Sequence, residues 1–386
     1  MDFELPLEVR MLRDLVRRFV DDELIPIEMQ VPEGDELPVA YLKPLQDKAR
    51  KLGLWHLNVP KALGGMGLGL LEACVVQEEV ARSKAIPFRL NELFGPYVDP
   101  VLLDACNEEQ KQRFLLPALK GDIRVCFAQT EPDAGADPAS MRTRAVRDGD
   151  SYVVNGTKRF ISFAGIADWA EVLCVTDPNK RGRGGITCLM IDLNAPGVSR
   201  PKRWQTMMGD TPGEIVFDDV RVPVTDRLGA EGQGFNLGQR YLTAGRVSGQ
   251  AAWSLGVAQR SLDMAIDYAK VRVTFGQPLA ERQAIQFMVA DSAMELRTAR
   301  LLVYETAWKF DRGDDIRNES YMAKLVCTEM AGRIVDRALQ ILGGIGLTKD
   351  LPIEYFYRQI RSLRITEGAS EVLRWRLGRN LMRERS

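Results

Sequence analysis

The fold of this chain is decided where an apolar strand runs into a loop of turn-forming residues: Val125-Cys126-Phe127-Ala128, then, after Gln129, Thr130-Glu131-Pro132-Asp133-Ala134-Gly135-Ala136-Asp137. Before this stretch apolar residues recur with the helical period, and after it they alternate as in strands. Pro132 and Gly135 fit an ordinary β-turn. The loop is also dense in small residues and backbone donors, so it could cradle a flat polar ligand through main-chain groups.

The segments on both sides of the strand region are helical in pattern. Asn107 with Gln110 predicts a capping box at a helix start, and Gly121 predicts the end of that helix. After Gly234 the helical period returns and predicts long helices over 281–310, 320–342 and 370–382. Short connections between long helices favour an antiparallel bundle. We therefore expect a helical domain over 1–122, a β domain over 123–231 and a helical bundle over 232–386.

Turn dipeptides and alternating apolar residues define the expected β domain. Asp148-Gly149 and Asn155-Gly156 predict hairpin turns on either side of a strand over 151–154. Further strands are expected over 171–176, 186–193 and 213–217.

Composition excludes several classes of site. The 386 residues carry 52 basic and 53 acidic side chains, so no basic field points to nucleic acid. The only histidine, His56, argues against histidine metal sites and histidine-based triads, and no metal site is expected. Six cysteines in apolar stretches, without a secretory signal or a bilayer-length apolar run, predict a cytoplasmic protein with no membrane span. A carboxylate, a lysine or a cofactor must therefore carry any chemistry.

Four further segments allow a functional or a plain structural interpretation. Residues 64–69 lack the spacing of a dinucleotide loop and favour a flexible turn. Residues 272–279 could bind a ring and a phosphate, or form a helix–helix corner. The three glycines in 340–346 exceed what a helix C-cap needs. Glu367 precedes the last helix, where it is either a dipole-favoured cap or a general base.

Taken together, these segments resemble the acyl-CoA dehydrogenase family over essentially the whole chain. The matching segments, in order, are residues 130–137, 155–158 with 160–162, 231–235, 272–279, 340–346 and 367–368. The resemblance implies a mainly α protein with a central β domain: an N-terminal α-helical domain, a β-barrel-like middle domain and a C-terminal four-helix bundle. FAD would lie between the last two domains.

The resemblance also implies a set of FAD contacts. Phe127, Ala128, Gln129 and Thr130 match the strand end whose backbone contacts the flavin. Phe160 replaces the tryptophan that packs on the isoalloxazine ring, and Ser162 matches the hydroxyl that reaches N5. A second group matches side chains that reach the FAD of a neighbouring subunit, which implies a homo-oligomer, usually a tetramer built as a dimer of dimers: Arg272, Phe275, Gln283, Gln340, Gly343 and Gly344.

Glu367 matches the family's catalytic base. It would take the α-proton of an acyl-CoA thioester while the β-hydrogen leaves as hydride to flavin N5, giving the trans-2-enoyl-CoA and passing electrons to an electron-transfer flavoprotein or similar acceptor. Gly368 would contribute to substrate binding beside it. Arg246 matches an arginine that holds the substrate near the base, although the stretch from Arg246 to Gly256 is one residue longer than the usual pattern.

The expected substrate pocket departs from the family pattern. Ala136 stands where a serine often touches CoA, and Thr243 stands where an aspartate precedes the substrate arginine. Thr366 and Ala369 replace a tyrosine and a threonine that flank the base. These changes suggest a branched, cyclic or bulky acyl group. Two alternatives stay open: a flavin-dependent oxygenase with the same fold, and a non-catalytic scaffold that has kept it.

Overall fold

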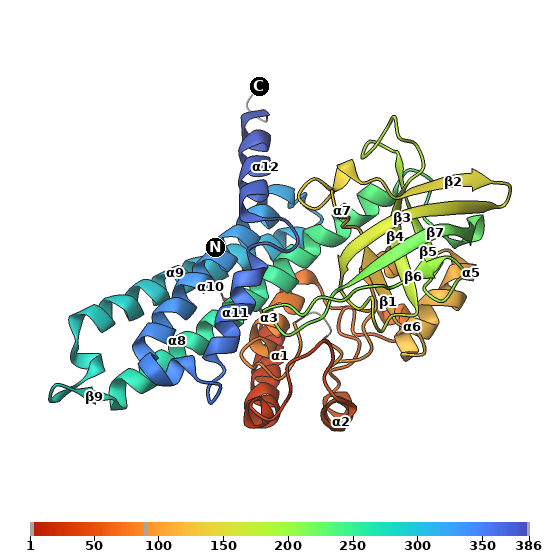
Figure 1. Ribbon diagram of the computed structural model, residues 1–386. Helices are drawn as coiled ribbons and strands as arrows, with labels where there is room; N and C mark the ends of the chain where they lie inside the picture. Colours follow the sequence, from red (N-terminus) through yellow and green to blue (C-terminus); the bar gives the residue numbers. More distant parts are fainter. Residues whose placement is uncertain (1–3, 89–90, 384–386) are drawn as a thin grey trace. The chain divides into compact units, whose positions relative to one another are not determined.

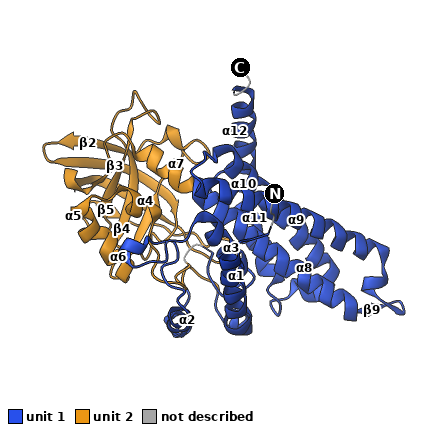
Figure 2. Ribbon diagram, turned by 180° about the vertical axis from the view of Figure 1, so that it is seen from behind, with its two compact units in different colours: residues 1–32, 37–88, 243–386 blue, residues 33–36, 89–242 orange. Residues whose placement is uncertain are grey.

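A computed structural model describes residues 4–88 and 91–383 of the chain. The chain divides into two compact units, which Figure 2 shows in different colours. Unit 1 comprises residues 1–32, 37–88 and 243–386, and unit 2 comprises residues 33–36 and 89–242. The expected fold class, mainly helical with a central sheet, is confirmed. The domain limits at residues 122 and 231 stay a prediction.

Unit 1 is a bundle of helices (Figure 1). Its helices are α1 (Leu7–Phe19), α2 (Val39–Lys51), α3 (Leu70–Val80), α8 (Trp253–Val271), α9 (Gln283–Asp311), α10 (Arg317–Leu342), α11 (Ile353–Leu363) and α12 (Ser370–Arg383). The short strands β9 (Val273–Thr274) and β10 (Gln277–Pro278) form a hairpin between α8 and α9. The three long helices expected from the sequence correspond to α9, α10 and α12. No helix in the described residues is long and apolar enough to cross a bilayer.

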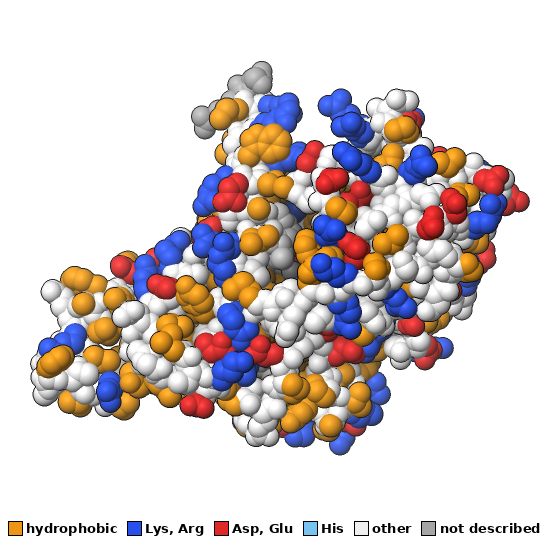
Figure 3. All heavy atoms as spheres, viewed as in Figure 1, with side chains coloured by type: hydrophobic (Ala, Val, Ile, Leu, Met, Phe, Trp, Pro, Cys, Tyr) orange, Lys and Arg blue, Asp and Glu red, His pale blue; other side chains and the backbone are white. Residues whose placement is uncertain are grey.

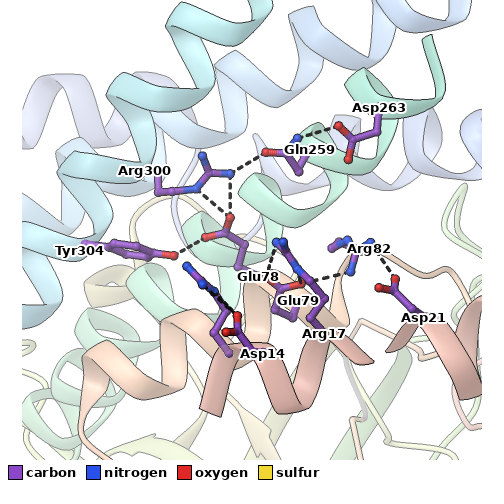
Figure 4. A network of polar contacts seen from close by, with 11 residues as sticks. Asp14, Arg17, Asp21, Glu78, Glu79, Arg82, Gln259, Asp263, Arg300 and Tyr304 are labelled. Carbon is purple, nitrogen blue, oxygen red and sulfur yellow. Dashed lines mark hydrogen bonds and ion pairs between the residues drawn. The ribbon is translucent and has the colours of Figure 1, made fainter. Parts of the chain in front are cut away.

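Two adjacent glutamates of α3 join it to the helices on either side (Figure 4). Glu78 accepts hydrogen bonds of 2.8 Å from Arg300 and from Tyr304, both on α9. Glu79 accepts hydrogen bonds from Arg17 on α1. Both carboxylates are buried, so the pairing offsets the desolvation that burial would otherwise cost. This polar network fixes α3 within the bundle.

Unit 2 is built around one mixed sheet. Its strands are β1 (Val125–Ala128), β2 (Arg144–Asp148), β3 (Ser151–Ile161), β4 (Trp169–Val175), β5 (Ile186–Asp192), β6 (Val198–Ser199), β7 (Gly213–Pro223) and β8 (Arg227–Leu228), in the order β6-β7-β3-β2-β4-β5-β8 with β1 parallel to β4. Three short helices precede the sheet: α4 (Pro100–Ala105), α5 (Glu108–Gln110) and α6 (Leu116–Lys120). The helix α7 (Gly234–Gly245) follows it.

The helix signals before the sheet are confirmed in atomic detail. The Asn107 side chain accepts from the Gln110 N–H at 2.9 Å, and the Gln110 side chain accepts from the Asn107 N–H at 3.0 Å. Gly121 ends α6 with φ +81°, the left-handed conformation that glycine adopts without strain.

The turn predicted at Asn155-Gly156 is wrong, whereas the turn at Asp148-Gly149 is confirmed. β3 continues through Asn155 and Gly156 to Ile161, and its register against β7 shifts between Val154 and Gly156. Gly156 has φ +152°, and a Cβ there would lie 2.4 Å from the Thr143 hydroxyl. The dipeptide therefore forms a β-bulge. A bulge, like a hairpin turn, favours a residue that tolerates positive φ, and here it also brings two backbone segments close together.

Unit 2 also buries two carboxyl groups side by side. Asp99 caps α4 by accepting the Val101 N–H at 2.9 Å, and Glu171 on β4 is fully buried next to it. Burial raises the pKa of Asp99 to about 6. Burial, and secondly the charge of Asp99, raise the pKa of Glu171 well above its ordinary value. The folded chain therefore binds a proton here that the unfolded chain releases.

We expect Glu171→Gln to stabilise the protein at pH 8. A group whose pKa is raised by folding contributes its full stability below its pKa in the unfolded chain, near 4. That contribution is lost as the pH rises through its pKa in the folded chain. The amide removes this cost, so the variant should gain about 1–3 kcal/mol at pH 8 and little at pH 4. Thermal unfolding at both pH values measures the difference, with the exposed Glu109→Gln as control. A gain that does not change with pH would contradict the explanation.

Candidate functional site

Glu367 lies in the turn between α11 and α12, in a backbone conformation that non-glycine residues rarely adopt. Its φ is +55° and that of Gly368 is +111°. The left-handed conformation costs a non-glycine residue roughly 1–2 kcal/mol, so neighbouring groups must hold it. Phe160 and Phe275, two other residues singled out in the sequence, also have positive φ. Strained backbone of this kind clusters at functional sites.

Two side chains of one helical segment hold Glu367. This segment, Arg246–Ala252, is a π-helix between α7 and α8. The Arg246 Nε donates to the Glu367 carbonyl at 2.8 Å, and the Gln250 Nε2 donates to the Glu367 Oε1 at 2.8 Å. At Gly245, a Cβ would lie 3.6 Å from the Glu367 Oε2, so this glycine faces the second oxygen of the carboxylate.

The surroundings of Glu367 are buried and cationic. Arg246 is only 6% exposed, and its guanidinium lies 5.4 Å from the ring centre of Tyr321. Burial lowers the pKa of Arg246, and the Glu367 charge opposes that shift. Lys324 of α10 is fully buried and donates to the Gly368 carbonyl at 2.7 Å. Two buried cations thus hold main-chain carbonyls of the turn, and an amide holds one carboxylate oxygen, so the Glu367 carboxylate is kept at a fixed place, as a general base requires.

Sequence reasoning missed Gln250, Lys324 and Tyr321. The spacing of four residues between Arg246 and Gln250 was the one available signal for Gln250, because it puts both on neighbouring turns of one helix. A π-helix takes in one more residue than the corresponding α-helix. Arg246 can therefore face Glu367 while Gly256, where a Cβ would lie 2.0 Å from the Glu78 carbonyl, still packs against α3.

The flavin-side residues expected from the sequence come together in unit 2. Phe127 and Ala128 end β1, and Gln129 and Thr130 begin the loop after it. The Gln129 carbonyl accepts from the Lys158 Nζ at 3.0 Å, and the Thr130 carbonyl accepts from the Arg159 N–H at 2.8 Å. These bonds tie the end of β1 to β3, on which Phe160 lies and after which Ser162 follows directly.

A buried ion pair supports this strand end. Lys158 is fully buried, and its Nζ lies 2.8 Å from the Glu131 Oε1. Glu131 also accepts the N–H groups of Arg142 and Thr143. Burial alone would raise the pKa of Glu131, but the Lys158 charge and these hydrogen bonds hold it below its ordinary value. The sequence match included Lys158 without giving it a role.

The donor set of unit 2 fits a flavin. The Phe160 ring is 56% exposed and packs on Trp204 with 4.8 Å between ring centres, so it offers an aromatic face. The Gln129 Oε1 is buried and has no hydrogen-bond partner among the described residues. A buried acceptor without a donor, together with an exposed aromatic ring and a serine hydroxyl in the same unit, suits a planar ring system with N–H groups.

Six other predicted residues lie on the surface of unit 1. The two-residue turn of the β9–β10 hairpin is formed by Phe275 and Gly276, both with positive φ, and leaves Phe275 98% exposed. Arg272 and Gln283 flank the hairpin, and Gln340, Gly343 and Gly344 lie at the end of α10; all are exposed. Ala136 is exposed in the loop after β1, and Thr243 lies on α7 three residues before Arg246.

Comparisons with known proteins agree with this arrangement. Family models match residues 6–122 as the acyl-CoA dehydrogenase N-terminal domain, 126–220 as the middle domain and 232–382 as the C-terminal domain. The chain is 38% identical to the bovine mitochondrial short-chain specific acyl-CoA dehydrogenase, over 96% of this chain and 89% of the relative. It is 39% identical to the caffeyl-CoA reductase-Etf complex subunit CarC of Acetobacterium woodii, over 94% of this chain and 95% of the relative.

A solved structure gives the same result. The butyryl-CoA dehydrogenase of Megasphaera elsdenii matches 99% of this chain and 100% of its own length, with a TM-score of 0.85 and 31% identity.

Proposed function

Because the chain belongs to the acyl-CoA dehydrogenase family and is an FAD-dependent oxidoreductase acting on CH–CH donors, we propose that it oxidises an acyl-CoA thioester to the trans-2-enoyl-CoA with Glu367 as the base. One observation carries the proposal: Glu367 is held in a strained turn by Arg246 and Gln250, within a buried cationic cluster. A glutamate that only capped the last helix would need neither the strained backbone nor the two long-range hydrogen bonds.

The geometry of the turn supports a division of labour between the two carboxylate oxygens. Gln250 orients Oε1, whereas Gly245, which has no side chain, faces Oε2. Because Oε1 already accepts the hydrogen bond from Gln250, the α-proton would pass to Oε2. As negative charge develops on the thioester oxygen, the backbone N–H of Glu367 would stabilise it, because a preorganised donor costs no reorganisation at that moment.

FAD, when bound, accepts the β-hydrogen as a hydride. In unit 2, the residues that would hold it are Phe127, Ala128, Gln129 and Thr130 through the strand end, Phe160 through its ring and Ser162 through its hydroxyl. The role of Lys158 is to keep the Gln129 carbonyl and the loop after it in place. We further propose an electron-transfer flavoprotein as acceptor, in line with the relative that is named as a subunit of an Etf complex.

The acyl group is defined by residues that replace larger or more polar ones of the family pattern. Thr366, whose hydroxyl lies 3.4 Å from the Gln250 Oε1, and Ala369 flank the base. Both leave more room than the tyrosine and threonine that the pattern has there. With Ala136 and Thr243 in place of polar residues, Arg246 and Gly368 would hold the thioester end. A branched, cyclic or bulky acyl group is the substrate class that this arrangement favours.

We propose that the enzyme is a homo-oligomer, a dimer of dimers, in which Arg272, Phe275, Gln283, Gln340, Gly343 and Gly344 complete a neighbour's FAD site. One face of α9 supports a second copy as the occupant. Phe287, Met294, Leu301 and Trp308 recur every seven residues and are 43–61% exposed. Hydrophobic side chains gather on the α8–α9 part of the bundle surface (Figure 3). A seven-residue apolar repeat is the pattern of a helix seam.

We expect the double variant Met294→Glu, Leu301→Glu to lower the oligomeric state, because charges in an apolar seam lose their hydration when it closes. Sedimentation velocity measures the assembly, and FAD content measures the completed cofactor site. Val39→Glu, at an exposed apolar position of α2, is the control. Unchanged sedimentation of the double variant would contradict the proposal for α9.

Anaerobic titration with straight, branched, cyclic and aryl acyl-CoA thioesters tests the function. The bound flavin should bleach with at least one class, and a dye acceptor should restore its colour. Rapid consumption of O2 with substrate would instead favour the oxygenase. Protein that is colourless and cannot be reconstituted with FAD would favour the non-catalytic scaffold.

A further inference from the structure

We propose that Lys324 is a positioning residue for the base, and that it sets the Glu367 carboxylate by holding the next peptide of the turn. This inference rests on the proposed role of Glu367. It adds a residue of α10 that is 43 positions away in the sequence and that the sequence analysis placed in a predicted helix without any role in a site.

The contacts of Lys324 point to the turn and to little else. The side chain is fully buried, and its one hydrogen bond in the described part of the chain goes from Nζ to the Gly368 carbonyl at 2.7 Å. No carboxylate lies within ion-pair distance of it among the described residues. The ammonium therefore binds a main-chain carbonyl, that of the residue after the proposed base.

Arg246 holds the preceding carbonyl in the same way. Its Nε donates to the Glu367 carbonyl at 2.8 Å, from the π-helical segment that precedes α8. The two peptides that follow the Cα of Glu367 are thus each fixed by a buried cation. Glu367 and Gly368 have φ of +55° and +111°, and other backbone conformations of this turn would have lower energy. The two cations keep the turn in the observed conformation.

Stability alone does not account for a lysine at this place. A buried ammonium loses its hydration, and a nonpolar side chain of similar volume is often neutral or stabilising instead. Burial lowers the pKa of Lys324 to about 8, while the Glu367 charge opposes the shift and Arg246 adds to it. The charge is thus retained at a cost, as is usual for groups that serve function rather than stability.

The test is Lys324→Met, which keeps the volume of the side chain and removes the donor. In anaerobic rapid mixing with acyl-CoA, we expect the limiting rate of flavin bleaching to fall about 100-fold, because a small displacement of a reacting group costs about that much. Substrate affinity and FAD content should stay near wild type, and the melting temperature should be equal or higher. Thr328→Val, which removes a buried hydroxyl one turn further along α10, should bleach at the wild-type rate.

Lys324→Gln gives a second, independent measurement. The amide keeps a donor for the Gly368 carbonyl, so its rate should lie between those of wild type and Lys324→Met. If the methionine variant does not fold, a lowered rate in the glutamine variant supports the proposal. Limiting rates at the wild-type level in whichever variants fold, including FAD-reconstituted protein, would overturn it. Failure of the proposed function looks different: wild type itself would not bleach, or Glu367→Gln would bleach as fast as wild type.

Discussion

Glu367→Gln should bind FAD and acyl-CoA but turn over at least about 1,000-fold more slowly than wild type. The amide has nearly the same shape, and Gln250 and Arg246 can still hold the turn. It cannot take a proton, and a positioned general base contributes typically about 10²–10⁴-fold. Steady-state turnover with a dye acceptor gives the rate, while the flavin spectrum confirms that the cofactor is bound.

The matched control is Glu371→Gln, an exposed glutamate on the first turn of α12. It makes the same chemical change four residues from Glu367 and should keep wild-type turnover. Equal losses in the two variants would mean that charge in this region, not the base itself, governs the rate. Wild-type turnover of Glu367→Gln would remove the carboxylate from the mechanism.

Lys158→Met should destabilise the protein by about 3–5 kcal/mol and lower its FAD content. The substitution leaves the buried Glu131 without its cation, and breaking a buried pair from one side is costly because the remaining charge has lost both water and partner. It also removes the donor to the Gln129 carbonyl. Thermal unfolding of the apo and FAD-loaded protein separates the loss of stability from the loss of cofactor binding.

Lys180→Met provides the comparison for this variant. Lys180 is in the same unit and pairs with Asp177 at the surface, where such pairs contribute little. It should therefore unfold like wild type. A Lys158→Met protein with unchanged unfolding and full FAD content would show that the pair does not support the strand end.

Local signals in the sequence predicted most of the fold. The capping box at Asn107 and the glycine stop at Gly121 act within one helix, so the residues that decide them are adjacent. Asn155-Gly156 failed for the opposite reason. A hairpin turn and a bulge both need a residue with unusual φ, and only the partner strand β7 determines which one forms.

In the candidate site, too, the residues in recognisable local segments could be predicted, and those that depend on distant partners could not. Glu367, Arg246 and Phe160 lie in segments that resemble a known family. Gln250 binds Glu367 from 117 residues away, and Lys324 binds Gly368 from 44 residues away. No local sequence pattern indicates either contact. Lys158 and Glu131, 27 residues apart, are likewise two ordinary charges until β3 brings them together. Long-range polar contacts of this kind require the folded chain.

The most direct test of the central claim is the rate of flavin bleaching with an acyl-CoA that carries deuterium at the α-carbon. If Glu367 removes the α-proton as the flavin is reduced, anaerobic rapid mixing should show wild type slowed about twofold or more by the label. Glu367→Gln should show almost no bleaching with either substrate. Equal wild-type rates with labelled and unlabelled substrate, together with rapid bleaching of Glu367→Gln, would contradict the account.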